Sequence, residues 1–387
     1  MYTLLTPLCL ESVHLLHKIT RRMRITIVAG ARPNFMKIAP LIRCIEKEKE
    51  QGENISYRLI YCGKQDDLSL DATLFYDLQI KAPDAYLGVD CKDPIEQIAL
   101  IMMEFNRELK RNPAHIVLVV DDLSATMSCS IVARKQGCKV AHLVAGTRSF
   151  NMDRPKELNR LITDGLSNYL FTAGTTANRN LDYTGTEREK VFHVGNILID
   201  NIRHNRNRIK KPVWFDLLKL QEKQFILLTL NRRELITHGQ TFRALMKTLI
   251  ETANGTPIVA PLHGYVQQAL ENLKMECNTL HMLPPQRYLN FIYLINQAKV
   301  VLTDSGNVAE EATFLGTPCI TINDYAEHPE TWKLGTNELV GEDTEKLKLK
   351  LAQALNNEWK QGILPERWDG RTAERILQIL KEEHTVQ

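Results

Sequence analysis

The stretch that decides the fold is residues 298–335, AKVVLTDSGNVAEEATFLGTPCITINDYAEHPETWKLG. Two short apolar runs, at 300–302 and 319–322, have the length and composition of buried strands. Between them, residues 307–314 predict a helix, which ends at Gly316 because glycine readily adopts the left-handed conformation that closes a helix. The stretch is therefore a β-α-β unit, and parallel units of this kind present ligands at the carboxyl ends of their strands.

The start of this helix is suited to an anion. Free N–H groups and the positive end of the helix dipole favour a phosphate there, and Ser305 and Gly306 allow a ligand close to the backbone. Glu311, on the first or second turn, is placed to hold the hydroxyl groups of a nucleotide sugar. The alternative is that Asp304 or Ser305 only caps the helix and that Glu311 is a solvated residue that complements the dipole.

Length and composition indicate an ordinary two-domain globular protein. The chain has 387 residues, 44% of them hydrophobic and 25% charged, with a net charge of +3. This balance gives no reason to expect a nucleic acid or a membrane surface as the partner, and no run approaches the roughly 20 apolar residues of a membrane span. The eight cysteines form no C-x-x-C pair, which favours free thiols in the cytoplasm over disulfides or a metal site.

Strand and helix signals alternate along the whole chain in two series. We expect an α/β protein with two doubly wound, Rossmann-like domains that face a cleft, at 23–202 and 215–387, joined by a polar linker at 203–214. The last helix could pack back on the first domain. Residues 1–22 lack the basic start and cleavage site of a signal peptide, and we interpret them as an extension outside the core.

Arg32 follows the first apolar strand and precedes a helix, where a guanidinium group can bind phosphate oxygens with two nitrogens. A surface cation is the simpler interpretation. The segment is not G-x-G-x-x-G, so no nicotinamide cofactor is indicated, and no cluster of residues requires a metal.

Several segments together resemble the non-hydrolysing UDP-N-acetylglucosamine 2-epimerases. DSGNVAEEATFLGTP at 304–318 is similar to the family's DSGG-x-x-EE and LG-x-P, and GARPNFMKIAPLI at 30–42 is similar to GTRPEAIKMAPLI. RPKELNRLITDGLSNYLF at 154–171 is similar to MPEEINR-x-LTD-x-LS-x-x-LF. The resemblance runs from about residue 23 to the C-terminus and implies the GT-B arrangement, a UDP-sugar ligand, no cofactor and a homodimer.

The resemblance also implies the residues of the site. In this family the enzyme inverts C2 of UDP-GlcNAc by eliminating UDP across C1–C2 and adding it back on the other face. Asp122 matches the family's acid/base aspartate, although an aspartate at that position is also a common helix cap. His263 and Phe291 equally suit structural roles, the latter as a core aromatic. The implied substrate-binding residues are Arg32, Lys37, Asn231, Arg232, Arg233, His263, Phe291, Ser305, Gly306 and Glu311.

The chain departs from the family pattern where proton transfer is expected. Val144 and Lys156 stand at glutamate positions, Asn231 and Gln65 at histidine positions, and His328 at an arginine position. Loss of one positioned acid or base typically costs about 10²–10⁴-fold in rate.

The retained substrate-binding residues and the substituted proton-transfer residues together are compatible with three functions. The first is a UDP-HexNAc 2-epimerase of surface polysaccharide or glycan precursor synthesis, in which Asp122, Glu157 or His328 compensates for the substituted residues. The second is a catalytically degenerate protein that binds a UDP-sugar, and the third is a UDP-sugar hydrolase or glycosyltransferase.

Overall fold

The first sheet has seven parallel strands in the order β3-β2-β1-β4-β5-β6-β7. The computed structural model describes residues 22–70, 72–275 and 277–385, so residues 1–21 of the expected extension lie outside the described residues. The strands are short apolar runs: β1 (Met23–Ala29), β2 (Ile55–Tyr61), β3 (Ala85–Tyr86), β4 (Ile116–Val120), β5 (Lys139–Leu143), β6 (Tyr169–Thr172) and β7 (Val191–His193).

Helices and short 3-10 turns connect these strands. They are α2 (Arg32–Glu50), α3 (Ala72–Leu78), α4 (Pro94–Arg111), α5 (Ser124–Lys135), α6 (Pro155–Leu166), α7 (Thr175–Tyr183), η1 (Arg188–Lys190), α8 (Ile197–His204) and η2 (Arg206–Arg208).

The helices cover both faces of this sheet because alternate strand residues point in opposite directions. Along β4, Leu118 packs into the same core as Phe35 of α2, whereas Val119 packs with Phe105 of α4 and Cys129 of α5. The first domain is therefore doubly wound, as the sequence predicts.

The second sheet has six parallel strands in the order β10-β9-β8-β11-β12-β13. The strands are β8 (Ile226–Thr229), β9 (Ile258–Pro261), β10 (Leu280–Leu283), β11 (Val300–Thr303), β12 (Cys319–Thr321) and β13 (Asn337–Leu339). The helices are α9 (Val213–Leu217), α10 (Arg233–Thr237), α11 (Gly239–Ala253), α12 (Gly264–Asn272), α13 (Tyr288–Gln297), α14 (Gly306–Leu315), α15 (Glu330–Lys333), α16 (Thr344–Leu355) and α17 (Thr372–Thr385).

The β-α-β unit predicted from residues 298–335 is confirmed as β11-α14-β12. Gly316 closes α14 with a φ of 70°, the left-handed conformation expected of a glycine there. None of the helices in the described part of the chain is long and apolar enough to cross a bilayer.

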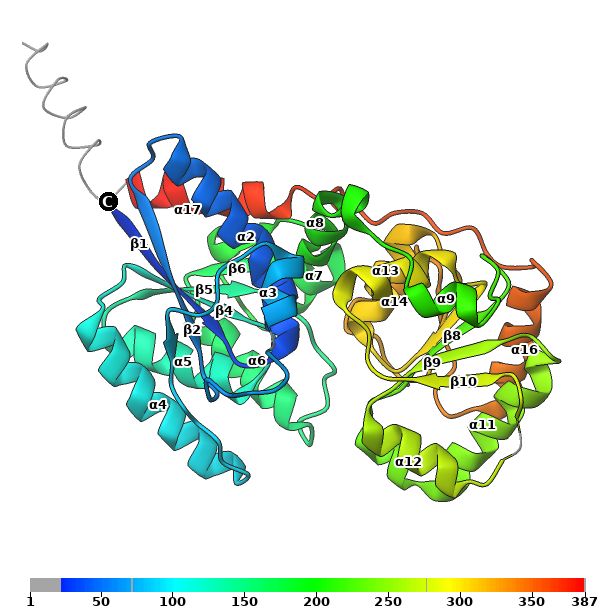
Figure 1. Cartoon of the computed structure of the whole chain (residues 1–387). Helices are drawn as coiled ribbons and strands as arrows, with labels where there is room; N and C mark the ends of the chain where they lie inside the picture. Colours follow the sequence, from blue (N-terminus) through cyan, green and yellow to red (C-terminus); the bar gives the residue numbers. More distant parts are fainter. Residues whose placement is uncertain (1–21, 71, 276, 386–387) are drawn as a thin grey trace, which may run out of the picture.

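The last helix, α17, lies beside α2 of the first domain, although it follows the second domain in the sequence (Figure 1). The buried carboxylate of Asp200 in α8 accepts hydrogen bonds from the backbone N–H groups of Thr372 (3.1 Å) and Ala373 (2.8 Å) at the start of α17. The indole of Trp368, just before α17, donates to the carbonyl of Ala173 at 2.9 Å. The end of the chain therefore ties the two domains together.

Candidate active site

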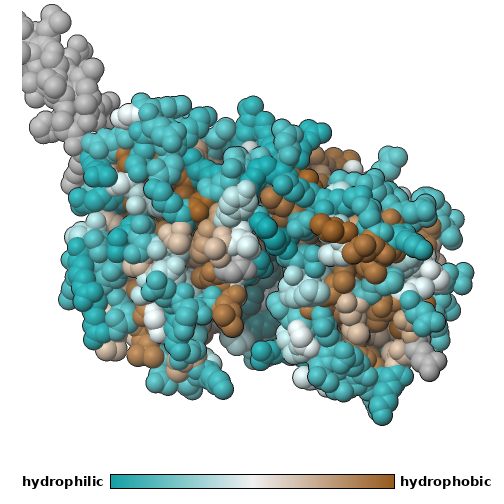
Figure 2. Space-filling view, in the orientation of Figure 1, coloured by the Kyte–Doolittle hydropathy of each residue, from teal (hydrophilic) through white to brown (hydrophobic). Residues whose placement is uncertain are grey.

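A cavity of about 1150 Å³ lies between the two domains, and the surface is hollowed at this place (Figure 2). Most of its lining residues follow strands β1, β4 and β5 of the first sheet and strands β8, β9, β11, β12 and β13 of the second. Such a position at the carboxyl ends of parallel strands is where doubly wound domains bind ligands. We call this cavity the interdomain cleft.

On the second domain, Asp304 holds together the two loops that face the cleft. Its carboxylate accepts the backbone N–H groups of Asn231 (2.7 Å) and Arg232 (2.6 Å). Burial raises the pKa of Asp304 although these amides oppose the rise. The side chain of Arg232 is held by Asn323 (3.0 Å) and Glu342 (2.5 Å), so its guanidinium group has a fixed position on the cleft wall.

The start of α14 opens into the cleft. Ser305 and Gly306 both line it. Ser305 is at the N-cap position, but its side chain makes no capping hydrogen bond, so the alternative of a simple serine cap does not apply. The side chain of Asp304 is committed to Asn231 and Arg232 instead. The free N–H groups of this ten-residue helix therefore face the cavity, as an anion site requires.

The structure places the two adjacent glutamates of α14 in different surroundings. Glu310, its neighbour, lines the cleft, whereas Glu311 is turned into the protein interior beside Tyr288. Burial, together with the charge of Glu310, raises the pKa of Glu311 to about 8. Successive helix residues point about 100° apart, which is why the two glutamates meet different neighbours.

On the first domain, the cleft wall carries a cluster of ion pairs around Asp122. Arg160 donates to Asp122 at 2.5 Å and to Glu327 of the second domain at 2.8 Å. Lys156, at the family's glutamate position, lies 3.3 Å from Asp122. The aspartate expected to take part in acid/base chemistry is therefore in the cleft, with two cations as partners.

Asp121 adds a second carboxylate to this wall. It has a φ of 61° at the position where the family pattern has glycine, and it accepts from Lys37 at 2.6 Å and from Asn34 at 2.8 Å. Burial by itself would lower the pKa of Lys37, but the charge of Asp121 outweighs it and the pKa is raised. Lys37 is therefore a fixed cation at the base of the cleft.

Besides Glu311, three further expected site residues lie outside the set that lines the cleft. Arg32 is the half-buried first residue of α2, between Ala31 and Pro33, which do line it. Phe291 packs against the hydrophobic core, in agreement with the simpler interpretation of that residue. The carboxylate of Glu157 is occupied by Ser149, whose N–H and hydroxyl groups both lie 2.8 Å from it.

Val144, at another glutamate position of the family pattern, also lies outside the cleft lining. It is half-buried against the core of the first domain and has a φ of 70°, which is unusual for a β-branched residue. It therefore supplies neither a proton acceptor nor a contact to the cavity.

Tyr265 is a cleft residue that the sequence did not reveal. Its hydroxyl donates to the backbone carbonyl of Asn231 at 2.7 Å and to the side-chain oxygen of the same residue. The ring stacks on His263, with the centroids 6.2 Å apart, and lies under the guanidinium group of Arg233 at 5.6 Å. Four residues from the two segments that follow β8 and β9 thus form one wall, and no single sequence motif joins them.

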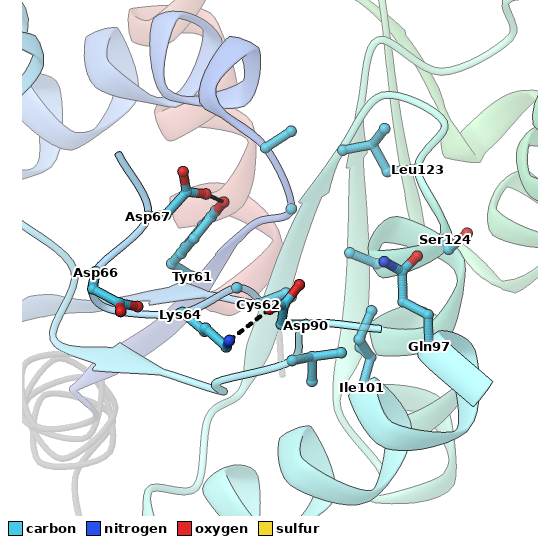
Figure 3. A pocket seen from close by; sticks show the side chains of 15 residues that line it. Tyr61, Cys62, Lys64, Asp66, Asp67, Asp90, Gln97, Ile101, Leu123 and Ser124 are labelled. Atoms are coloured by element: carbon cyan, nitrogen blue, oxygen red, sulfur yellow. Dashed lines mark hydrogen bonds and ion pairs between the residues drawn. The ribbon is translucent and has the colours of Figure 1, made fainter. Parts of the chain in front are cut away.

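A smaller cavity of about 630 Å³ adjoins the cleft through Ala31 and Leu123. Figure 3 shows Lys64 paired with Asp90 (2.5 Å) and Tyr61 with Asp67 (2.5 Å) on its wall. Its carboxylates make it a poor place for a diphosphate. Gln65, at a family histidine position, is not among its lining residues.

Two doubly wound domains that face one cleft define a protein of the GT-B fold. The chain belongs to the UDP-N-acetylglucosamine 2-epimerase family, whose profile matches residues 47–381. A UDP-N-acetylglucosamine 2-epimerase of Methanocaldococcus jannaschii is 32% identical over 371 residues, covering 92% of this chain and 99% of that protein. A UDP-2,3-diacetamido-2,3-dideoxy-D-glucuronate 2-epimerase of Pseudomonas aeruginosa is 32% identical over 322 residues, covering 82% and 88%.

Solved structures agree with this assignment. The crystal structure of the Methanocaldococcus jannaschii UDP-GlcNAc 2-epimerase in complex with UDP-GlcNAc and UDP is 30% identical and has a TM-score of 0.81. The match covers 93% of this chain and 100% of that one.

Proposed function

We propose that the protein is an enzyme that inverts C2 of a UDP-linked 2-acetamido sugar by eliminating UDP and adding it back. One observation carries the proposal. An anion-binding helix start and fixed arginines on the second domain share one cleft with protic side chains from both domains. We place the reaction in the cytoplasm, where UDP-sugars serve precursor synthesis, and expect a homodimer.

The diphosphate would bind against the second domain. Gly306 at the start of α14 and the cations Arg232 and Arg233 line the cleft there. Ser305 lines it as well, although its own N–H group donates to the hydroxyl of Thr303 at 3.0 Å. Donors of this kind stabilise the negative charge that grows on UDP as its bond to C1 breaks. Lys37, across the cleft, supplies a further positive charge.

The proton transfers would use the two walls. Asp122 belongs to the first domain and His328 to the second, and both line the cleft. In the forward step one group takes the C2 proton while the C1–O bond breaks and a C1–C2 double bond forms. UDP then adds back to C1 while a group on the opposite face returns a proton to C2, so the reaction balances without an oxidant or reductant.

Incubation of the purified protein with UDP-GlcNAc in D₂O tests the proposal. We expect incorporation of deuterium at C2, measured by mass spectrometry and NMR. The UDP-linked diacetamido-glucuronate should be tested in parallel. Binding without exchange for every UDP-sugar would instead support a binding protein. Release of UDP with a hydrolysed or transferred sugar would support a hydrolase or glycosyltransferase.

A further inference from the structure

A buried carboxylate without a full set of partners lies at the base of the interdomain cleft. Glu310 is 1% exposed, and its Oε2 accepts from the amide of Asn196 at 2.5 Å. Its Oε1 has no hydrogen-bond partner among the described residues. The nearest cation-forming group is His328, whose Nε2 lies 3.7 Å from this oxygen, in ion-pair range but longer than a hydrogen bond. A buried oxygen without a hydrogen bond destabilises the fold, which points to a role for this oxygen in the site.

The other charged groups around His328 are already paired. Glu327 accepts from Arg160 at 2.8 Å, and Glu330 accepts from the backbone N–H of Thr176 at 2.9 Å. Lys37, whose charge also interacts with Glu310, is paired with Asp121. Among the described carboxylates around His328, Glu310 is the one whose oxygen lies within ion-pair range of the imidazole.

We propose that Glu310 is a positioning residue that makes His328 a proton acceptor for the epimerisation; this rests on the proposed function. With the Nε2–H group directed at Glu310, the other ring nitrogen, Nδ1, is left to take the C2 proton as UDP departs. The imidazolium ion that forms is stabilised by the Glu310 carboxylate. When the reaction runs in reverse, Nδ1 returns the proton and the ring becomes neutral again.

The distance of 3.7 Å between His328 and Glu310 becomes a hydrogen bond after a movement of well under 1 Å. Hydrogen bonds of catalytic groups are often long in the free enzyme and shorten in the complex. Asn196 fixes the Glu310 side chain from the first domain, while His328 sits on the loop before α15 of the second. Glu310 lies on α14 of the same domain as His328, so the pair can meet without a movement of one domain against the other.

The variant Glu310→Gln tests the proposal, because glutamine keeps the shape and can still bond to Asn196. We expect kcat for C2 exchange to fall about 100-fold or more, with KM changed less than about threefold, since the interaction strengthens only when the ring becomes charged. Glu251→Gln, the same change on the exposed face of α11, is the control.

A double variant decides whether Glu310 acts through His328. If it does, Glu310→Gln will cost little in the His328→Gln background. Equal losses in both backgrounds, or a Glu310→Gln enzyme with normal kcat, would overturn the inference. A melting temperature close to the wild-type value shows that the variant is folded. Lack of C2 exchange in the wild type with every UDP-sugar would instead refute the proposed function itself.

Discussion

At the scale of single residues, Tyr265 determines what Asn231 can offer to a ligand. Because the Tyr265 hydroxyl donates to the side-chain oxygen of Asn231, the amide N–H groups are the part left for a phosphate or sugar oxygen. We expect Tyr265→Phe to weaken UDP binding about threefold to tenfold, measured by titration calorimetry, from the loss of about one hydrogen bond. Tyr183→Phe, on an exposed surface, should leave the affinity unchanged.

Glu311 makes the stability depend on pH. Its pKa is raised to about 8 in the folded protein, so the folded state holds a proton that the unfolded chain loses above about pH 4.3. Stability should therefore fall as pH rises from about 4.3 to 8, by on the order of 1 kcal/mol per pH unit. Glu311→Gln removes this dependence, and urea unfolding should show it more stable than wild type at pH 8 but not at pH 4. A parallel loss at both pH values would contradict this.

At the scale of elements, the β-α-β unit at 298–335 was predictable because strand length, glycine placement and apolar pattern are local properties. The sequence did not predict which side of α14 faces the cleft. Whether Glu310 or Glu311 lines the cleft depends on how the helix is rotated against its sheet, which tertiary packing decides. The same reason explains Tyr265, since its contact with Asn231 joins residues 34 positions apart.

Gly195 marks the place where the segment before α17 crosses the first domain. It has a φ of 99°, and an added Cβ would collide with the backbone oxygen of Arg367. Gly52 has a similar φ of 92°, but a Cβ added there would meet no atom within 4 Å. A substitution of Gly52 therefore measures the cost of the left-handed backbone conformation without a steric clash. We expect Gly52→Ala to cost about 1 kcal/mol and Gly195→Ala at least about 2 kcal/mol more, measured by chemical unfolding. Equal costs would mean that the crossing segment moves aside freely.

At the scale of the whole molecule, Asp200 anchors α17 to the first domain through two backbone N–H groups. We expect Asp200→Ala to cost about 1–2 kcal/mol and to speed amide hydrogen exchange in α17 while α16 stays protected. Asp343→Ala removes the cap of α16, which Asp343 makes by accepting from Lys346 at 3.0 Å, and should give the opposite pattern. Faster exchange in both helices of the Asp200 variant would argue against a local anchor.

The position of α17 has a consequence for biosynthesis. Ile376, Leu377 and Leu380 share a core with residues of β1 and α2, yet they are the last apolar groups of that core to be translated. A nascent chain emerging from the ribosome cannot cover this surface until the segment that forms α17 has been synthesised. Part of the apolar core of the first domain therefore stays exposed during synthesis, because α17, which completes that core, follows the second domain in the sequence.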